Sequence, residues 1–187
     1  MEEKRANPAP LGLAGFAFTT WMLSMVNAGW YSADAMGIVL ALAFAYGGLA
    51  QLVAGILEYP RGNTFGTVAF FSYGAFWISF ALLQQFFGTK VPPTTVDWYL
   101  LIWGIFTLYM WFASFRTDRA LWSVFLGLWL TFVVLAMGGF LGSSMVTRIG
   151  GYLGLITAVL AFYSSAAQVI NELFGRVVLP VGPMSHS

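Results

Sequence analysis

The sequence contains no cysteine and a single histidine, His186. The missing cysteine excludes disulfides, thiolate metal ligands and cysteine nucleophiles. With one histidine outside the hydrophobic segments, haem ligation by paired histidines and histidine-based acid–base chemistry within those segments are excluded as well. Charge is also scarce, because 8% of the residues are charged and 59% are hydrophobic, whereas soluble domains carry roughly 25% charged residues. The composition therefore predicts a chain whose solvent is a lipid bilayer.

Sets of residues that perform catalysis are missing from the hydrophobic segments too. There is no Gly-x-Ser-x-Gly, no serine–histidine pair, no cluster of carboxylates and no spacing typical of metal ligands. The formal net charge of +1 creates no basic field for nucleic acid. We therefore expect neither an enzyme nor a nucleic-acid-binding protein, and no cofactor or metal.

The few charges leave six long intervals without any charged residue: 6–33, 35–57, 62–89, 98–115, 120–147 and 149–171. A helix needs roughly 20 apolar residues to cross a hydrocarbon core. The sequence thus predicts an all-α integral membrane protein, a bundle of six transmembrane helices with a central pore, forming a single domain over residues 1–187. The predicted spans are 11–31, 36–57, 64–87, 98–115, 120–142 and 150–174.

The basic residues are distributed unequally over the predicted loops. Six lie on one side of the membrane, whereas the other side has only Lys90 and Arg148; the six are Lys4, Arg5, Arg61, Arg116, Arg119 and Arg176. Cytoplasmic loops carry the excess of lysine and arginine. We therefore expect a multi-pass protein of the cytoplasmic membrane with both termini in the cytoplasm.

Polar side chains recur at helical spacing inside three of the predicted spans. They are Thr20 and Asn27 in the first, Gln51 and Glu58 in the second, and Gln168, Asn171 and Glu172 in the sixth. Buried amides in a membrane usually face the bundle interior or a wet cavity, where they either bond neighbouring helices or line a pathway. The two carboxylates lie at span ends and can pair with Arg61 and Arg176. Together these stripes indicate a route for a small polar solute.

The segment at the start of the first span is a recognisable motif, Asn-Pro-Ala-Pro-Leu-Gly-Leu at residues 7–13. It resembles the signature of the acetate uptake transporter family, the succinate–acetate permeases of the GPR1/FUN34/YaaH group. Further matching blocks lie at 47–51 (Gly-Gly-Leu-Ala-Gln), 58–59 (Glu-Tyr), 62–66 (Gly-Asn-Thr-Phe-Gly), 72–74 (Ser-Tyr-Gly), 174–176 (Phe-Gly-Arg) and 179–180 (Leu-Pro).

This resemblance implies a six-helix channel-like fold that assembles as a homohexamer, with one pore per protomer passing acetate and succinate. It also implies a narrow apolar constriction, whose positions match Phe16, Tyr73 and Leu128. Some bacterial members have a histidine just before the asparagine of the first helix, where this chain has Val26. A role for that imidazole in proton coupling therefore does not carry over.

Elementary chemistry is compatible with such a pore. Proline ahead of a helix leaves its first N–H groups without intrahelical partners, so Asn7 and the backbone of Leu11, Gly12 and Leu13 are predicted to form an anion site. We predict a channel or proton-linked permease for acetate-like carboxylates. A urea or amide channel and a structural or regulatory membrane subunit without transport activity are the alternatives.

Overall fold

The computed structural model describes residues 6–88 and 90–184, so the predictions for Lys4, Arg5 and His186 lie outside the described residues. Six helical segments are long and apolar enough to cross a membrane. They are α1 (Ala9–Asn27), the continuous run Ala33–Arg61, the run Thr64–Phe87, α5 (Pro93–Ser114), α6 (Arg119–Phe140) and α7 (Ser144–Phe174). The prediction of an all-α bundle with six spans is confirmed.

The second and third spans are composite helices. The second consists of a short 3₁₀ turn (Ala33–Ala35), α2 (Met36–Phe44), a π-helical segment (Ala45–Ala50), α3 (Gln51–Glu58) and a second 3₁₀ turn (Tyr59–Arg61). The third joins α4 (Thr64–Leu82) to a π-helical end (Leu83–Phe87). Such π segments are rare in helices and often mark functional sites.

Several helices begin or end at positions that the charge pattern did not predict. The fourth span begins at Pro93 instead of residue 98, and the sixth at Ser144 instead of residue 150. Asp97 and Arg148 therefore lie inside helices. A transmembrane helix can continue past the hydrocarbon core of the bilayer, and its ends can then include charged residues. The first span ends at Asn27 instead of residue 31, where Gly29 adopts a φ of 79°.

Capping residues fix the loops between these helices. The side chain of Asn63 accepts a hydrogen bond from Gly66 N at the start of α4, at 3.0 Å. Asp118 accepts one from Leu121 N at the start of α6, at 2.8 Å. These caps satisfy N–H groups that have no partner within the helix. Burial raises the pKa of the Asp118 carboxyl, although its backbone hydrogen bonds oppose that shift.

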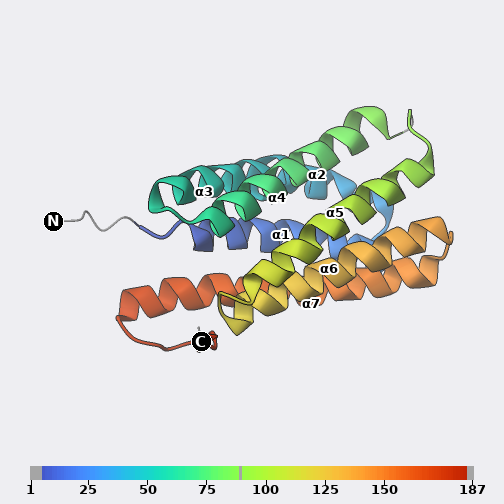
Figure 1. Ribbon diagram of the computed structural model, residues 1–187. Coiled ribbons are helices and arrows are strands. Elements are labelled where there is room, and N and C mark those ends of the chain that lie inside the picture. Colours follow the sequence, from blue (N-terminus) through green and yellow to red (C-terminus); the bar gives the residue numbers. More distant parts are fainter. Residues whose placement is uncertain (1–5, 89, 185–187) are drawn as a thin grey trace.

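Helix α1 lies between α7 and the composite second span, whose π segment it contacts (Figure 1). Glycines allow this close packing: a Cβ on Gly47 would overlap the side chain of Thr19, and a Cβ on Gly151 would overlap the backbone of Ala28. Small residues of this kind let helix backbones approach each other in lipid. In Figure 1, α1 begins and α7 ends at the same end of the bundle.

Candidate functional site

Two cavities lie in the bundle interior. The first, of about 60 Å³, is walled mainly by α1, α4 and α6. Its lining is largely apolar, with three amide side chains among fifteen residues: Ala9, Leu13, Phe16, Gln51, Asn63, Phe65, Gly66, Ala69, Phe70, Tyr73, Leu121, Val124, Phe125, Leu128 and Gln168. Such a lining suits a solute with a small polar group and an apolar remainder.

The second cavity, of about 40 Å³, lies further along the same three helices. Its lining combines aromatic rings with hydroxyl groups and one amide: Phe16, Thr20, Leu23, Ser24, Asn27, Phe76, Trp77, Phe80, Leu100, Leu128, Thr131, Phe132 and Leu135. Phe16 and Leu128 line both cavities. These two side chains therefore form the partition between the cavities.

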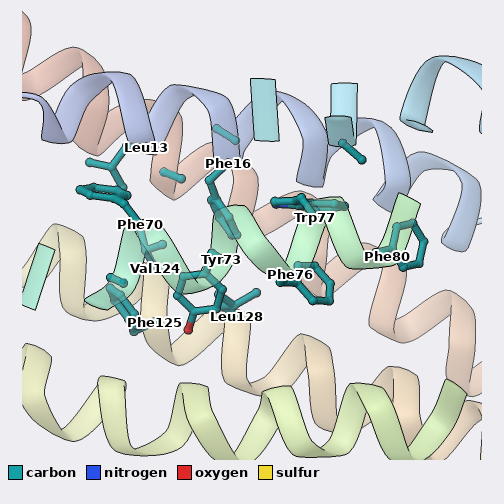
Figure 2. Packing of buried hydrophobic residues seen from close by; sticks show 14 of the residues in the cluster. Leu13, Phe16, Phe70, Tyr73, Phe76, Trp77, Phe80, Val124, Phe125 and Leu128 are labelled. Atoms are coloured by element: carbon teal, nitrogen blue, oxygen red, sulfur yellow. The ribbon is translucent and has the colours of Figure 1, made fainter. Parts of the chain in front are cut away.

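Tyr73 completes this partition from α4. Phe16, Tyr73 and Leu128 are all buried, with exposed fractions of 5%, 4% and 5%. The rings of Phe16 and Tyr73 have their centroids 6.2 Å apart. In Figure 2 Phe16 points from α1 toward Tyr73 and Leu128, with Leu13, Phe70 and Val124 on one side and Phe76, Trp77 and Phe80 on the other. The structure thus brings together the three residues that the family resemblance indicated.

The polar end of Tyr73 is turned away from both cavities. Its hydroxyl lies 2.9 Å from Thr107 Oγ on α5, and Figure 2 shows this oxygen pointing away from Phe16. The ring packs against Phe106 and Phe125, with centroids 5.3 and 6.1 Å away. The partition therefore presents apolar surface to a solute, and the hydroxyl anchors the ring from behind.

Four of the predicted polar residues line the two cavities, two in each. Gln51 and Gln168 line the first, and Thr20 and Asn27 line the second. Gln51 also donates from Nε2 to the carbonyl of Gly47 in the π segment, at 2.7 Å. Gln51 thus both bonds its own helix and lines the cavity.

Asn7 connects the start of α1 to α7 beside the first cavity. Its Nδ2 donates to Gln168 Oε1 at 2.9 Å, and Ser165 Oγ donates to the carbonyl of Pro10 at 2.8 Å. Gln168 lines the cavity. The predicted motif therefore holds two helices together at the edge of the cavity.

The predicted anion site on the motif backbone does not match this geometry. Ala9 N donates to Asn7 Oδ1 at 3.1 Å, and the N–H groups of Leu11 and Gly12 donate to the carbonyl of Pro8 at 3.1 and 3.3 Å. The Asn7 side chain thus accepts from the first residue of α1, and the carbonyl of Pro8 already accepts from two of the N–H groups that were expected to hold a carboxylate.

The next three residues of the motif, Leu11, Gly12 and Leu13, face different surroundings. Leu11 is 38% exposed on the outside of the bundle. Gly12 faces Phe70, where a Cβ would overlap the ring, and Leu13 lines the first cavity. Of these three predicted residues, only Leu13 belongs to the cavity lining.

Glu58, Asn171 and Glu172 are missing from the described lining of both cavities. Glu58 is buried, with Arg61 Nε 3.5 Å from its Oε2 and Asn63 Nδ2 donating to the same oxygen at 3.0 Å. This ion pair is the one expected from the sequence. Glu58 does not line the first cavity, but it accepts a hydrogen bond from Asn63, which does. Glu172 is exposed.

Asn171 binds the segment that follows α7 and lines neither of the two cavities. Its Oδ1 accepts from Val178 N and Leu179 N at 2.7 and 2.9 Å, and its Nδ2 donates to the carbonyl of Leu179 at 2.8 Å. The chain then continues to the start of α6, where Arg119 N donates to Gly182 O at 2.9 Å. Asn171 therefore fastens the segment after α7 to the bundle.

Sequence reasoning missed several lining residues, above all Asn63 in the first cavity and Trp77 in the second. Trp77 follows Tyr73 by one helical turn, so their spacing on α4 was a usable signal. Periodicity alone, however, does not tell whether an aromatic stripe faces lipid or the bundle interior. The contacts across α1 and α4 supply that information.

Comparison with known proteins finds matches over nearly the whole chain. Residues 1–186 match the model of the GPR1/FUN34/yaaH family. The succinate-acetate/proton symporter SatP of Escherichia coli (strain K12) is 45% identical over 183 residues, covering 96% of each chain. Acetate permease A of Emericella nidulans is 38% identical over 197 residues, which cover 95% of this chain and 66% of that protein.

A solved structure has the same fold. It is described as the bacterial acetate channel SatP, and it superimposes with a TM-score of 0.91 at 43% sequence identity. The match covers 96% of this chain and 100% of the other. The helices that wall the two cavities therefore have counterparts in a channel.

Proposed function

Because the chain belongs to the GPR1/FUN34/yaaH family, we propose that it transports acetate and related small carboxylates, succinate among them, across a membrane. The observation that carries this proposal is the pair of interior cavities that meet at Phe16 and Leu128. The relatives named for succinate, acetate and proton symport and for acetate permeation support the choice of solute.

The apolar partition explains how small carboxylates would be selected. Removing water from a charged group is costly unless new partners replace it. A small monocarboxylate loses fewer water molecules at Phe16, Tyr73 and Leu128 than a larger or doubly charged acid does. Passage as the neutral acid, or together with a proton, lowers this barrier further. We therefore propose two alternative mechanisms, proton-linked transport and passage through a channel.

The orientation and the assembly of the chain are part of the same proposal. Arg61, Arg116, Arg119 and Arg176 follow or precede the helix ends on the side where α1 begins and α7 ends. Positive-inside bias places that side in the cytoplasm, with the protein in the cytoplasmic membrane. We propose that the whole chain is one pore-forming domain, and that six copies assemble as the family resemblance implies.

Flux measurements in liposomes test this function. Purified protein is reconstituted, and uptake of labelled acetate is compared with uptake by empty vesicles, with and without an imposed proton gradient. We expect uptake above the empty vesicles and competition by unlabelled small carboxylates. Acetate uptake equal to that of empty vesicles would indicate a structural subunit without transport activity. Urea uptake that carboxylates do not inhibit would indicate a urea or amide channel.

The proton gradient separates the two mechanisms. Acetate accumulation driven by an inward proton gradient indicates symport, whereas flux that follows only the acetate gradient indicates a channel. Native mass spectrometry of the same preparation tests the hexamer, since any other subunit number contradicts the proposed assembly.

A further inference from the structure

Passage of a solute between the two cavities requires a movement of the partition. The cavities are separate in this structure, and Phe16, Tyr73 and Leu128 are buried between them. Because protein interiors are close-packed, a solute crosses the partition only when at least one of these side chains moves aside. The packing of the helices that carry them decides which one can move.

Close glycine contacts hold the helices of two of these side chains, α1 and α6. On α1, a Cβ at Gly15 would overlap the carbonyl of Tyr46 in the π segment. On α6, a Cβ at Gly127 would overlap the hydroxyl of Thr157 on α7. Helices that approach their neighbours this closely cannot shift without overlap or loss of packing.

The interface between α4 and α5 is built differently. Gly74 of α4 faces the second span and Gly104 of α5 faces α6, and among the described residues no glycine of α4 or α5 faces the other of these two helices. Aromatic side chains bridge the interface instead, with the ring centroids of Phe76 and Trp103 5.2 Å apart. The bundle can therefore widen between α4 and α5 with less loss of backbone packing than at the glycine contacts.

Two tyrosine hydroxyls join the helices across this interface. The hydroxyl of Tyr99 on α5 lies 2.7 Å from Ser79 Oγ and donates to the carbonyl of Phe76 at 3.1 Å. The hydroxyl of Tyr73 on α4 lies 2.9 Å from Thr107 Oγ on α5. The second of these bonds holds a residue of the partition itself.

The direction of the bond between Tyr73 and Thr107 follows from the other partner of Thr107. Thr107 Oγ donates to the carbonyl of Trp103 at 2.7 Å, and a hydroxyl has one proton to donate. The Tyr73 hydroxyl is therefore the donor and Thr107 Oγ the acceptor. The two side chains are 4% and 0% exposed, so breaking the bond leaves a buried donor unpaired, which costs free energy.

We propose that Thr107 is a positioning residue for transport, which holds the Tyr73 ring in the closed partition until the hydrogen bond breaks and the interface between α4 and α5 widens. This inference rests on the proposed transport function. Thr107 lines neither cavity, so it affects the opening without touching the solute. The bond therefore adds to the barrier for every solute alike.

Transport kinetics of matched variants test this role. We expect Thr107→Val to raise the maximal rate of acetate flux roughly fivefold, because the closed partition loses a buried hydrogen bond that the open one has already broken. The KM for acetate is expected to stay at the wild-type value. Thr107→Ser keeps the hydroxyl and is expected to retain the wild-type rate. The control is Thr19→Val, which removes an equally buried hydroxyl whose bond lies within α1.

A double-mutant cycle identifies this hydrogen bond as the cause. Tyr73→Phe removes the donor and is expected to raise the rate by a similar factor, whereas Tyr73→Phe combined with Thr107→Val is expected to give no further increase. Loss of folded protein lowers flux, so a structural role alone does not produce a gain. Rates at or below the wild-type value in both single variants would contradict the proposal, and so would full additivity in the double variant.

Fluorine nuclear magnetic resonance observes the Tyr73 ring without any transport. The protein is labelled with fluorotyrosine, and the Tyr73 signal is identified by its loss in Tyr73→Phe. In Thr107→Val we expect this signal to show exchange between two environments. Tyr163 is the internal control, because its hydroxyl donates to the carbonyl of Pro180 far from the partition, and its signal is expected to stay unchanged.

The spectra separate a failure of this inference from a failure of the proposed function. A Tyr73 signal that is the same in Thr107→Val as in the wild type overturns the positioning role, whether or not the wild-type protein transports acetate. If the Tyr73 signal changes but the wild-type protein shows no acetate flux, the proposed function fails, and with it the role in transport, while the contact between Thr107 and Tyr73 stands.

Discussion

At the scale of single residues, the partition between the cavities depends on the size of two side chains. Phe16 and Leu128 line both cavities, so truncating either one widens the passage. We expect Phe16→Ala and Leu128→Ala to raise the permeability of a four-carbon monocarboxylate relative to acetate roughly tenfold, since apolar sites discriminate chain length by about this factor. Competitive flux in liposomes measures the ratio.

The control for this prediction is Leu160→Ala, which removes the same atoms as Leu128→Ala from a partly buried position on α7 outside both cavities. Its selectivity is expected to match that of the wild type. If both partition variants also keep the wild-type ratio, Phe16 and Leu128 do not set the solute size.

Tyr73 allows the ring to be separated from its hydroxyl. The hydroxyl bonds Thr107 on α5 at 2.9 Å, away from the cavities. We expect Tyr73→Phe to leave selectivity unchanged and to lower stability by about 1 kcal/mol, the usual net value of a hydrogen bond. Thermal unfolding and competitive flux measure the two effects. A change in selectivity at full stability would place the hydroxyl in the pathway.

At the scale of helices, the π segment Ala45–Ala50 fixes the contact between the second span and α1. Gly47 packs against Thr19 with no room for a Cβ, and its carbonyl accepts the hydrogen bond from Gln51. We expect Gly47→Ala to destabilise the protein by about 1–3 kcal/mol, the usual cost of overpacking. Adding Thr19→Ala makes room for the new methyl group and is expected to restore part of the loss in a thermal unfolding assay.

The control is Gly37→Ala, at a glycine in α2 whose Cβ would meet no neighbour within 4 Å. It is expected to be neutral or slightly stabilising, because alanine favours helix over glycine. If Gly47→Ala unfolds like the Gly37→Ala control, the two helices do not pack as tightly as the structure indicates.

A second prediction at the scale of helices concerns the segment that follows α7, which Asn171 attaches to the bundle. Asn171→Ala removes three hydrogen bonds to Val178 and Leu179. We expect proteolysis after α7 to become faster, while the KM for acetate stays at the wild-type value because Asn171 lines neither cavity. A raised KM with unchanged proteolysis would return Asn171 to the pathway.

At the scale of the whole molecule, the absence of native cysteine makes orientation straightforward to measure. We expect Thr64→Cys and Arg116→Cys, both exposed near the end where α1 begins, to react only with reagents that reach the cytoplasm. Ser32→Cys and Ser144→Cys, exposed at the opposite end, are expected to react with a membrane-impermeant maleimide on intact cells. The reverse labelling pattern would contradict the proposed orientation.

The sequence determined the membrane class and the number of spans. Each spanning segment must satisfy its own backbone hydrogen bonds in lipid, so the charge-free intervals alone indicate six helices. The same reasoning began two helices too late, after Asp97 and after Arg148, because a charge limits the hydrocarbon span and not the helix. The motif at 7–13 indicated the family, which the family model confirms, and the family resemblance implied that Phe16, Tyr73 and Leu128 are neighbours.

Only the tertiary structure decided which side chains share the interior. Asn171 lies at helical spacing from cavity residues, yet it bonds the following segment, and Leu11 points outward from a motif that also contributes Leu13. Trp77 lines the second cavity, although its spacing in the sequence does not tell whether it faces lipid or the interior. The physical reason is that the rotation and close approach of neighbouring helices, set here by contacts such as that of Gly47 with Thr19, depend on pairs of residues far apart in the chain.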